Sequence, residues 1–445
     1  MSGQSPNSPT VCERLAARLS RPVGAESRAR AALHVLDWVG CAVAGAGGAA
    51  ARAMKQALAP QKAADQTLYL GALGNVLEMD DVDKQALLHP GPVVIPAAIG
   101  AAAIAAVDAK TFLDGVVRGY EAVIRVGRAV GPDHYRFWHN TGTVGPFGAA
   151  AAASSVLGLD QEKTVWALGL AGTQASGFWE VRHEPASHAK QLHTARAAHA
   201  GLLAAQLANA GFIGLRSIIE GPQGFFAATC GEADPNKVAA FPENDPWSIH
   251  EVSFKPWPAC RHAHAAIDAA LQLKATGVDP EAIKAIIIRT YGDALNFCDK
   301  PDPLDTLSAK FSLQHAAAIA LLRGAPDLDA FEQEARDEDA VRSLRQRITV
   351  IEGAEFTDRY PARFGAAIDV ELFNEEHRRV EIGDALGDPE NPVTTKQLLD
   401  KGRMLMDAGG LGKEAREAII ETVIALPDDV SFSRFHDQLI AAVRL

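Results

Sequence analysis

One stretch of the sequence, residues 182–199, concentrates side chains that can bind and protonate an anion. It contains one acid, Glu184, and seven potentially cationic residues: Arg182, His183, His188, Lys190, His193, Arg196 and His199. Lys190 and His193 lie three residues apart, so they share a face if the segment is helical. Such a cluster can hold a di- or tricarboxylate and stabilise the charge that builds on it during proton abstraction. The alternative is a solvated basic surface.

Acidic residues cluster just before His89-Pro90-Gly91-Pro92. They are Glu78, Asp80, Asp81 and Asp83. Mutual repulsion raises the pKa of some of these carboxyl groups if they are buried. A carboxyl group with a raised pKa can act as a general acid or base near neutral pH. The alternative is a solvated acidic loop before the helix expected from Val93.

A third segment places His139 just before Thr141-Gly142-Thr143, at the start of an Ala-rich run. A Gly/Thr loop that leads into a helix presents backbone N–H groups and hydroxyls, which suit a carboxylate. The alternative is an ordinary helix N-cap formed by Thr141 or Thr143.

The segment 255–264 supplies Cys260, Arg261, His262 and His264. In a helix, two residues turn through about 200°, so the two histidines would point to opposite sides. HExxH and CxxC spacings are absent, so no metal site is predicted. Cys260 as a nucleophile has no further support in the sequence. His315 lies in an apolar run, where a histidine is more often a core or cap residue.

Other features narrow the class of protein. The sequence has no GxGxxG after a strand, no Walker A loop and no GxSxG elbow, so nucleotide cofactors, flavin cofactors and serine-hydrolase chemistry lack support. A net charge of −12 argues against nucleic acid or an anionic membrane as partner. The five cysteines lack CxxC spacing and the N-terminus is polar, which favours a cytoplasmic location.

These residues must be positioned by two domains, because 445 residues are too many for one ordinary core. Ala-rich helical patterns extend to about residue 270 and return from Thr395. Between them lie β-branched runs at 285–291 and 347–353, which helical runs separate. A partly alternating run at 366–374 and, after a short polar turn, a run at 378–383 are expected to form a hairpin. We therefore predict a mainly α protein. A discontinuous all-helical domain spans 1–270 and 395–445, and an inserted α+β lid domain with an antiparallel sheet spans 271–394.

The order of these segments resembles the MmgE/PrpD family, which includes 2-methylcitrate dehydratase, cis-aconitate decarboxylase and iminodisuccinate epimerase. The similar stretches are LDWVGCAVAG (36–45), the MDD to HPG region (79–91), HNTGTVGPFGAAAAAS (139–154), AKQLH (189–193), EGPQGFF (220–226), KPWPACRHAHAAIDAA (255–270) and AKFSLQHAAAIALL (309–322). They extend over nearly the whole chain. The resemblance implies a helical domain with an α+β lid, a homodimer, no cofactor and an active site between the domains.

The resemblance places seven residues in the family's motifs: Glu78, Asp80, Asp81, His89, His139, Lys190 and His264. Together with the clusters described above, they give the predicted site. The predicted catalytic residues are Glu78, Asp80, His89, His139, Lys190 and His264. The predicted substrate-binding residues are Asp81, Thr141, Arg182, His193, Arg261 and His315. Similar family members have aspartate at Glu78, threonine or serine near Val82 and often tyrosine at His315. These differences fall where substrate is expected, so they bear on the reaction rather than on the fold.

The resulting hypothesis is proton transfer at a carbon next to a carboxylate. Lys190, Arg182 and His264 would bind substrate carboxylates, and His139 or His89 would serve as the base or acid. The pair Glu78 and Asp80 would tune that histidine or donate the other proton. We rank a dehydratase-type lyase first, with an epimerase of an iminodisuccinate-like acid or a cis-aconitate-type decarboxylase as alternatives. A non-catalytic carboxylate-binding protein is the rival from another class.

Overall fold

The computed structural model describes residues 8–58, 62–184, 187–242, 245–428 and 431–444. The chain forms two compact units. The first comprises Met1–Val252 and Thr394–Leu445, and the second comprises Ser253–Val393. The sequence placed the first boundary at 270 instead of 252. Residues 253–270 belong to the second unit because α13 (His264–Ala275) packs against that unit's sheet and α16 (Leu313–Leu322).

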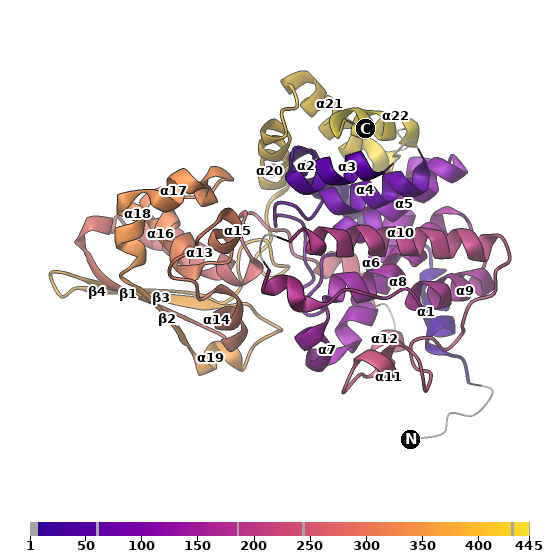
Figure 1. Cartoon of the computed structure of the whole chain (residues 1–445), viewed down its shortest axis with the longest axis horizontal. Coiled ribbons are helices and arrows are strands. Elements are labelled where there is room, and N and C mark those ends of the chain that lie inside the picture. The colour runs from indigo at the N-terminus through magenta and orange to yellow at the C-terminus, as the bar shows by residue number, and fades with distance from the viewer. Residues whose placement is uncertain (1–7, 59–61, 185–186, 243–244, 429–430, 445) are drawn as a thin grey trace. The chain divides into compact units, whose positions relative to one another are not determined.

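The first unit is helical (Figure 1). Its helices before residue 253 are α1 (Val11–Leu19), α2 (Ala25–Gly45), α3 (Ala49–Ala57), α4 (Ala63–Leu73), α5 (Gly91–Ala105), α6 (Ala109–Ala129), α7 (Gly131–Phe137), α8 (Asn140–Val156), α9 (Gln161–Gly172), α10 (Ala189–Asn209), α11 (Phe225–Thr229) and α12 (Pro235–Ala239). A short 3-10 helix, η1 (Trp179–Arg182), precedes α10. Helix α10 begins at Ala189, so Lys190 and His193 both lie on it.

Helix α8 is the core of this unit and packs against α5, α6, α9 and α10. All but one of its residues are buried, because small side chains let neighbouring helices approach closely. A Cβ atom on Gly201 of α10 would lie 2.3 Å from Cβ of Ala149. A Cβ atom on Gly148 would lie 2.6 Å from Cβ of Val123 on α6. The helix that carries Thr141 is therefore held on several sides.

The C-terminal segment folds back onto this same unit. It forms α20 (Thr395–Ala408), α21 (Lys413–Ala425) and α22 (Phe432–Ala442), and α20 packs against α2. The buried Lys401 donates hydrogen bonds to Asp37 Oδ1 at 2.5 Å and to the Met79 carbonyl at 2.6 Å. Burial raises the pKa of Asp37 to about 6, although the nearby Lys401 opposes that change. Through the Met79 carbonyl, helix α20 is thereby bonded to residues 78–83, which contain the acidic cluster and are called the acidic segment below.

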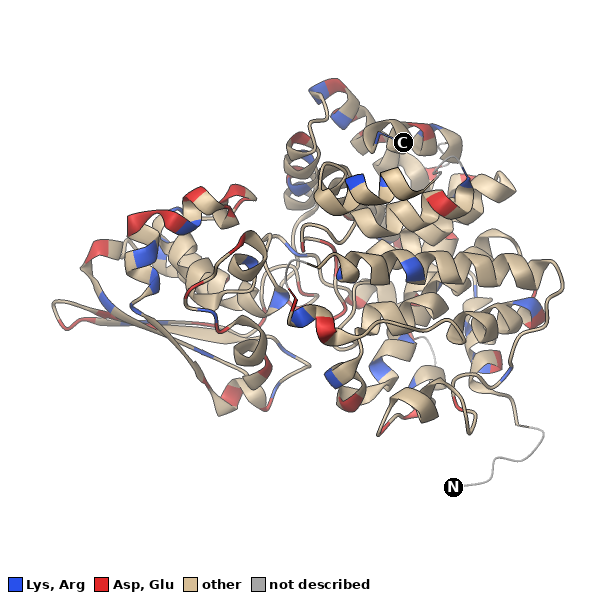
Figure 2. Cartoon of the chain, in the orientation of Figure 1, with Lys and Arg blue, Asp and Glu red and all other residues tan. Residues whose placement is uncertain are grey.

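The second unit is an α+β domain (Figure 1). Besides α13 and α16 it contains β1 (Ile283–Thr290), α14 (Gly292–Cys298), α15 (Thr306–Lys310), α17 (Gln333–Asp337), α18 (Asp339–Arg345), β2 (Ile348–Glu352), α19 (Ala354–Thr357), β3 (Ala366–Leu372) and β4 (His377–Ile382). Helix α13 packs against β3, β4 and α16. Residues of both charge signs are distributed over both units (Figure 2).

The sheet is mixed, in the strand order β2-β1-β3-β4, and the expectation of a wholly antiparallel sheet is wrong. The hairpin β3–β4 is antiparallel, as expected, and so is β1–β3. Strands β1 and β2 are parallel, with Ile288 opposite Val350. The long helical connection from β1 to β2 carries the chain back to the starting edge, so β2 runs in the same direction as β1.

Among the described residues, no individual helix has both the length and the apolar composition needed to cross a bilayer, and α2 with α3 meet those criteria only as a pair bent by 85°. The polar N-terminal segment behind the predicted cytoplasmic location lies mostly outside the described ranges.

Candidate active site

Asp81 is the anchor of the acidic segment between α4 and α5. Its Oδ2 accepts hydrogen bonds from His34 Nδ1 at 2.7 Å and Tyr120 Oη at 2.6 Å, and its Oδ1 accepts one from the Gly91 amide at 2.9 Å. A Cβ atom on Gly91 would lie 2.7 Å from Asp81 Oδ1, so the glycine makes room for this carboxylate. Both oxygens of Asp81 are thus used in positioning the segment, and its substrate-binding role stays a prediction.

The side chains of His34 and Tyr120 that hold Asp81 are themselves fully buried. Burial lowers the pKa of His34 to about 4, although the bond to Asp81 opposes this change. Burial, with the nearby Asp81, raises the pKa of Tyr120 well above its usual value. Both residues therefore act as neutral hydrogen-bond donors to the side chain of Asp81.

Asp80, the adjacent residue, forms a dyad with His89. Both Asp80 oxygens accept from Asn75 Nδ2, at 3.0 and 2.8 Å, and Oδ2 lies 3.0 Å from His89 Nδ1. His89 Nδ1 also lies 2.9 Å from the Asp81 carbonyl. A carboxylate and a carbonyl both accept, so in the neutral ring Nδ1 carries the proton and Nε2 has the lone pair. The described part of the chain shows no hydrogen bond to that Nε2, which leaves it for chemistry.

Glu78 and Lys190 form an ion pair between the acidic segment and α10. Glu78 is buried and has a left-handed backbone conformation, with φ of 59°. Lys190 lies in the first turn of α10 and is half-buried. The pair brings a cation to the segment that contains the Asp80–His89 dyad.

His139, just before α8, meets His193, the fifth residue of α10. Their Nδ1 atoms lie 3.1 Å apart. Burial, then the charges of Lys190, His193 and His89, lower the pKa of His139 well below its usual value. Burial and Lys190 lower the pKa of His193 to about 4. Both rings are therefore neutral at pH 7, and they are suited to proton transfer rather than to holding a carboxylate by charge.

Thr141 connects these groups. Its Oγ1 accepts a hydrogen bond from the His89 amide at 3.1 Å, and it lies two residues beyond His139. The electrostatic effects of His89, His193 and Lys190 on His139 show the same convergence. The first unit thus gathers Asp80, His89, His139, Lys190 and His193 into one site. The hydroxyl of Thr141 serves as part of its frame.

Arg182 lies at the end of η1, and its guanidinium carbon is 5.7 Å from the centre of the Trp179 ring. That ring in turn lies 4.5 Å, between ring centres, from His139. Arg182 is half-buried and is connected to the site through this aromatic side chain. Its predicted role in carboxylate binding stays a prediction.

The predicted residues of the second unit are arranged differently. Arg261 Nη2 pairs with Asp388 Oδ1 at 2.5 Å, and its Nη1 donates to the Leu386 carbonyl at 3.1 Å and to His264 Nδ1 at 3.0 Å. His264 Nε2 lies 3.2 Å from the Ala259 carbonyl. Both ring nitrogens of His264 are thus bonded inside this unit. The roles assigned to Arg261 and His264 remain predictions.

His315 in α16 is fully buried, and its Nε2 donates to the Ala330 carbonyl at 2.8 Å. Burial lowers its pKa to about 4, against the effect of that hydrogen bond. These contacts are those of a core residue, which was the alternative interpretation of its sequence context. Its substrate-binding role stays a prediction.

Sequence reasoning missed the residues that hold the acidic segment from behind: His34, Asn75, Tyr120 and Lys401. Their partners are separated from them by up to 322 residues, so no local pattern connects them. Asn75 alone lies within five residues of its partner Asp80, which is a detectable signal.

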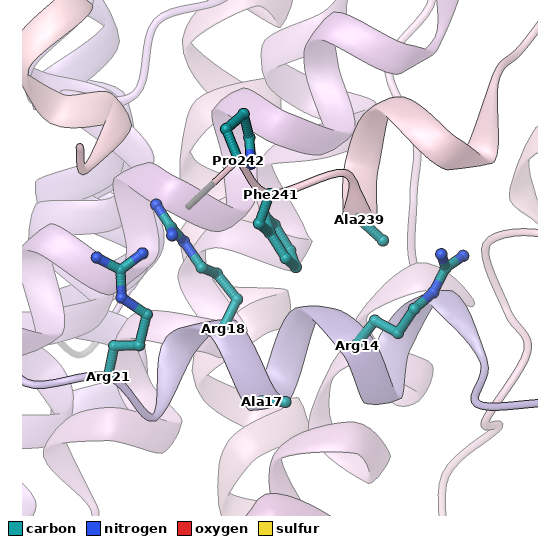
Figure 3. Close-up of a pocket in the computed structure, with 7 residues that line it drawn as sticks. All are labelled: Arg14, Ala17, Arg18, Arg21, Ala239, Phe241 and Pro242. Atoms are coloured by element: carbon teal, nitrogen blue, oxygen red, sulfur yellow. The ribbon is translucent and has the colours of Figure 1, made fainter. Parts of the chain in front are cut away.

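Two further features lie apart from this site. The carboxylates of Asp384, Asp388 and Glu390 have oxygens within 4.8 Å of one another and could attract a cation, but Asp388 already bonds Arg261 and Ser253. A groove of about 580 Å³ runs along α1 (Figure 3), and it is lined by Arg14, Ala17, Arg18, Arg21, Ala239, Phe241 and Pro242. Arg18 there pairs with Glu121 at 2.9 Å and Asp245 at 3.2 Å, which identifies a structural role.

Comparison with known proteins matches residues 19–238 to the MmgE/PrpD N-terminal domain and residues 257–426 to the MmgE/PrpD C-terminal domain. A cis-aconitate decarboxylase-like protein of Aspergillus oryzae is 28% identical over 401 residues, covering 84% of this chain and 81% of that protein. The cis-aconitate decarboxylase of Aspergillus terreus is 24% identical, covering 78% and 75%. The 2-methylcitrate dehydratase of Salmonella typhimurium is 27% identical, covering 61% and 58%.

Proposed function

The chain belongs to the MmgE/PrpD family, and from that premise we propose that it is a lyase acting on a small di- or tricarboxylate. The proposed reaction moves a proton at a carbon next to a carboxylate. The observation that carries the proposal is the Asp80–His89 dyad, whose Nε2 lone pair lies in the same site as Lys190 and the His139–His193 pair.

A carbon next to a carboxylate is weakly acidic, so its deprotonation needs a base and nearby positive charge. His89 Nε2 is the base, because Asp80 holds the proton on Nδ1 and stabilises the imidazolium that forms. Lys190 supplies the positive charge for the developing carbanion. On substrate binding, Lys190 would exchange part of its ion pair with Glu78 for an ion pair with the substrate carboxylate.

Dehydration ranks first because elimination requires two groups, a base and an acid. His89 takes the proton from carbon, the electron pair forms the carbon–carbon double bond, and the carbon–oxygen bond breaks. The departing hydroxyl leaves as water after it takes a proton from an N–H of the His139–His193 pair. The site has both groups in one unit, on α8, α10 and the segment before α5.

Decarboxylation is the second candidate, favoured by the comparisons. The cis-aconitate decarboxylase-like protein of Aspergillus oryzae and the cis-aconitate decarboxylase of Aspergillus terreus align over 84% and 78% of the chain, against 61% for the Salmonella dehydratase. In that reaction a carbon–carbon bond breaks, CO2 leaves, and the electron pair left on carbon takes a proton from the same histidines.

The homodimer expected from the family resemblance remains a prediction, and sedimentation analysis would check it.

The test is turnover in heavy water. The purified full chain is incubated separately with 2-methylcitrate, citrate, cis-aconitate and iminodisuccinate, and products are identified by NMR and mass spectrometry. A new alkene absorbance without loss of carbon indicates dehydration, and release of CO2 indicates decarboxylation. Deuterium uptake with loss of optical rotation and no new absorbance indicates an epimerase and overturns the lyase proposal.

Variants assign the site. Lys190→Ala and His139→Ala are each expected to reduce turnover by about 10²-fold or more. Lys163→Ala on α9 and His199→Ala on α10 are matched controls for loss of a lysine and a histidine. Turnover that persists unchanged in both site variants contradicts the proposed site. Binding of a dicarboxylate without any exchange at carbon points to the non-catalytic alternative.

A further inference from the structure

The hydrogen bond between His139 and His193 joins the same atom of each ring. The two Nδ1 atoms lie 3.1 Å apart, with ring centres 5.3 Å apart and ring planes inclined by 46°. His139 precedes α8 and His193 is the fifth residue of α10, so the pair exists only in the folded chain. Each ring thus keeps its Nε2 for other partners.

Two glycines hold the rings in this geometry. A Cβ atom on Gly142 would lie 2.6 Å from the Ser176 carbonyl and 3.2 Å from His193 Cβ. Gly177 has a φ of +135°, which other residues rarely adopt, and its amide carbonyl accepts from the His139 amide at 2.9 Å. A Cβ atom on Gly177 would lie 3.4 Å from the His193 ring. The slot for His193 is therefore built by the backbone and leaves the ring little freedom.

A neutral imidazole has one N–H and one lone pair, so an Nδ1···Nδ1 hydrogen bond needs opposite tautomers in its two rings. One ring carries its proton on Nδ1 and has the lone pair on Nε2. The other has the lone pair on Nδ1 and its proton on Nε2. Both rings are neutral at pH 7, because burial lowers the pKa of each.

Burial decides which ring has which tautomer. His139 is 1% exposed, whereas His193 is half-buried. The described residues include no hydrogen-bond partner for either Nε2. An N–H donor without a partner is rarer in protein interiors than an acceptor without one. The Nε2 proton therefore belongs on His193, where water can accept it, and the Nε2 lone pair belongs on His139.

We propose that His193 is a positioning residue that fixes the tautomer of His139, with His139 Nδ1 donating to His193 Nδ1. His139 then presents a basic Nε2, and His193 presents an Nε2–H donor from the same pair. This replaces the predicted carboxylate-binding role of His193 with a positioning role through Nδ1, while its Nε2–H is the N–H that the pair offers to the departing hydroxyl. The inference deepens the proposed function and rests on it only for its catalytic consequence, since the tautomer itself is a property of the free protein.

The test is ¹⁵N NMR of the full chain labelled at histidine, at pH 7, because ¹⁵N shifts distinguish protonated from unprotonated ring nitrogens. We expect His139 to be protonated at Nδ1, His193 to be protonated at Nε2, and a coupling to be visible across the Nδ1···Nδ1 bond. A His139 ring protonated at Nε2 in the unmodified protein overturns the proposal without any variant.

Two variants extend the test. In His193→Leu the acceptor is lost, so part of the His139 population should lose its Nδ1 proton to Nε2. In His193→Asn the side-chain Oδ1 can accept, so the Nδ1-protonated form of His139 should be retained. His199→Leu, farther along α10, is the matched control. An unchanged His139 tautomer in folded His193→Leu contradicts the proposal. If the tautomers are as expected but the chain turns over none of the tested acids, the proposed function is contradicted and the tautomer assignment stands.

Discussion

The buried histidine behind the acidic segment should make the stability of the first unit depend on pH. Burial lowers the pKa of His34 to about 4, against about 6.5 in an unfolded chain. Between these values the unfolded chain binds the proton and the folded chain does not. The free energy of unfolding must therefore fall as pH drops through that window.

The magnitude follows from the two pKa values. Once the pH lies below both, the loss contributed by His34 is about 3 kcal/mol. At pH 5 it is about 2 kcal/mol relative to pH 7, because the unfolded form is then almost fully protonated. The substitution His34→Asn removes the titration, and its amide N–H can still donate to Asp81. It also leaves a small cavity, but that penalty does not change with pH.

The measurement is urea unfolding of the full chain and of His34→Asn at pH 7 and pH 5. The unmodified chain should lose about 2 kcal/mol more than the variant between the two pH values. His183→Asn, which replaces an exposed histidine of the same unit, is the control for loss of a histidine. If the free energy of unfolding falls equally in the unmodified chain and in His34→Asn between pH 7 and pH 5, the assignment of His34 as a neutral donor to Asp81 is refuted.

Three further outcomes are expected. Asp80→Asn should reduce turnover by about 10²- to 10⁴-fold, because a neutral amide cannot stabilise the imidazolium that forms on His89, and the rate at saturating substrate checks it. Lys401→Met should destabilise the first unit by about 3–5 kcal/mol in urea unfolding, because Asp37 would stay buried without its cation, and Asp37→Leu added to it should restore part of that loss. Gly201→Ala should destabilise the same unit by about 1–3 kcal/mol, since its new methyl would meet Ala149, and a thermal unfolding scan would detect it.

Much of the fold follows from local pattern. The partly alternating run at 366–374 and the short polar turn after it predict a hairpin that ends at residue 383, and the structure has β3 and β4 there. The direction of β2 was not predictable in this way. It depends on the path of the long connection after β1, and a strand's own residues carry little information about the direction of its neighbour.

The acidic segment shows the same division. Its sequence indicated that carboxylates and His89 could do acid–base chemistry, and the structure brings Asp80 to His89. Asp80 and Asp81 are neighbours of one type, so sequence could not tell the partner of His89 from the anchor. Contacts with His34 and Tyr120, 47 and 39 residues away, distinguish them, because they consume the oxygens of Asp81.

By itself, the sequence determined the family, the helical and α+β character of the two parts, and the residue types available for proton transfer. Those properties are local, since they follow from side-chain chemistry and from the periodicity of short segments. Only the tertiary structure decided which carboxylate pairs with a histidine and which two imidazoles share a proton. A hydrogen bond needs atoms about 3 Å apart in a defined direction, and for residues on different helices that condition is met only when the whole unit has packed.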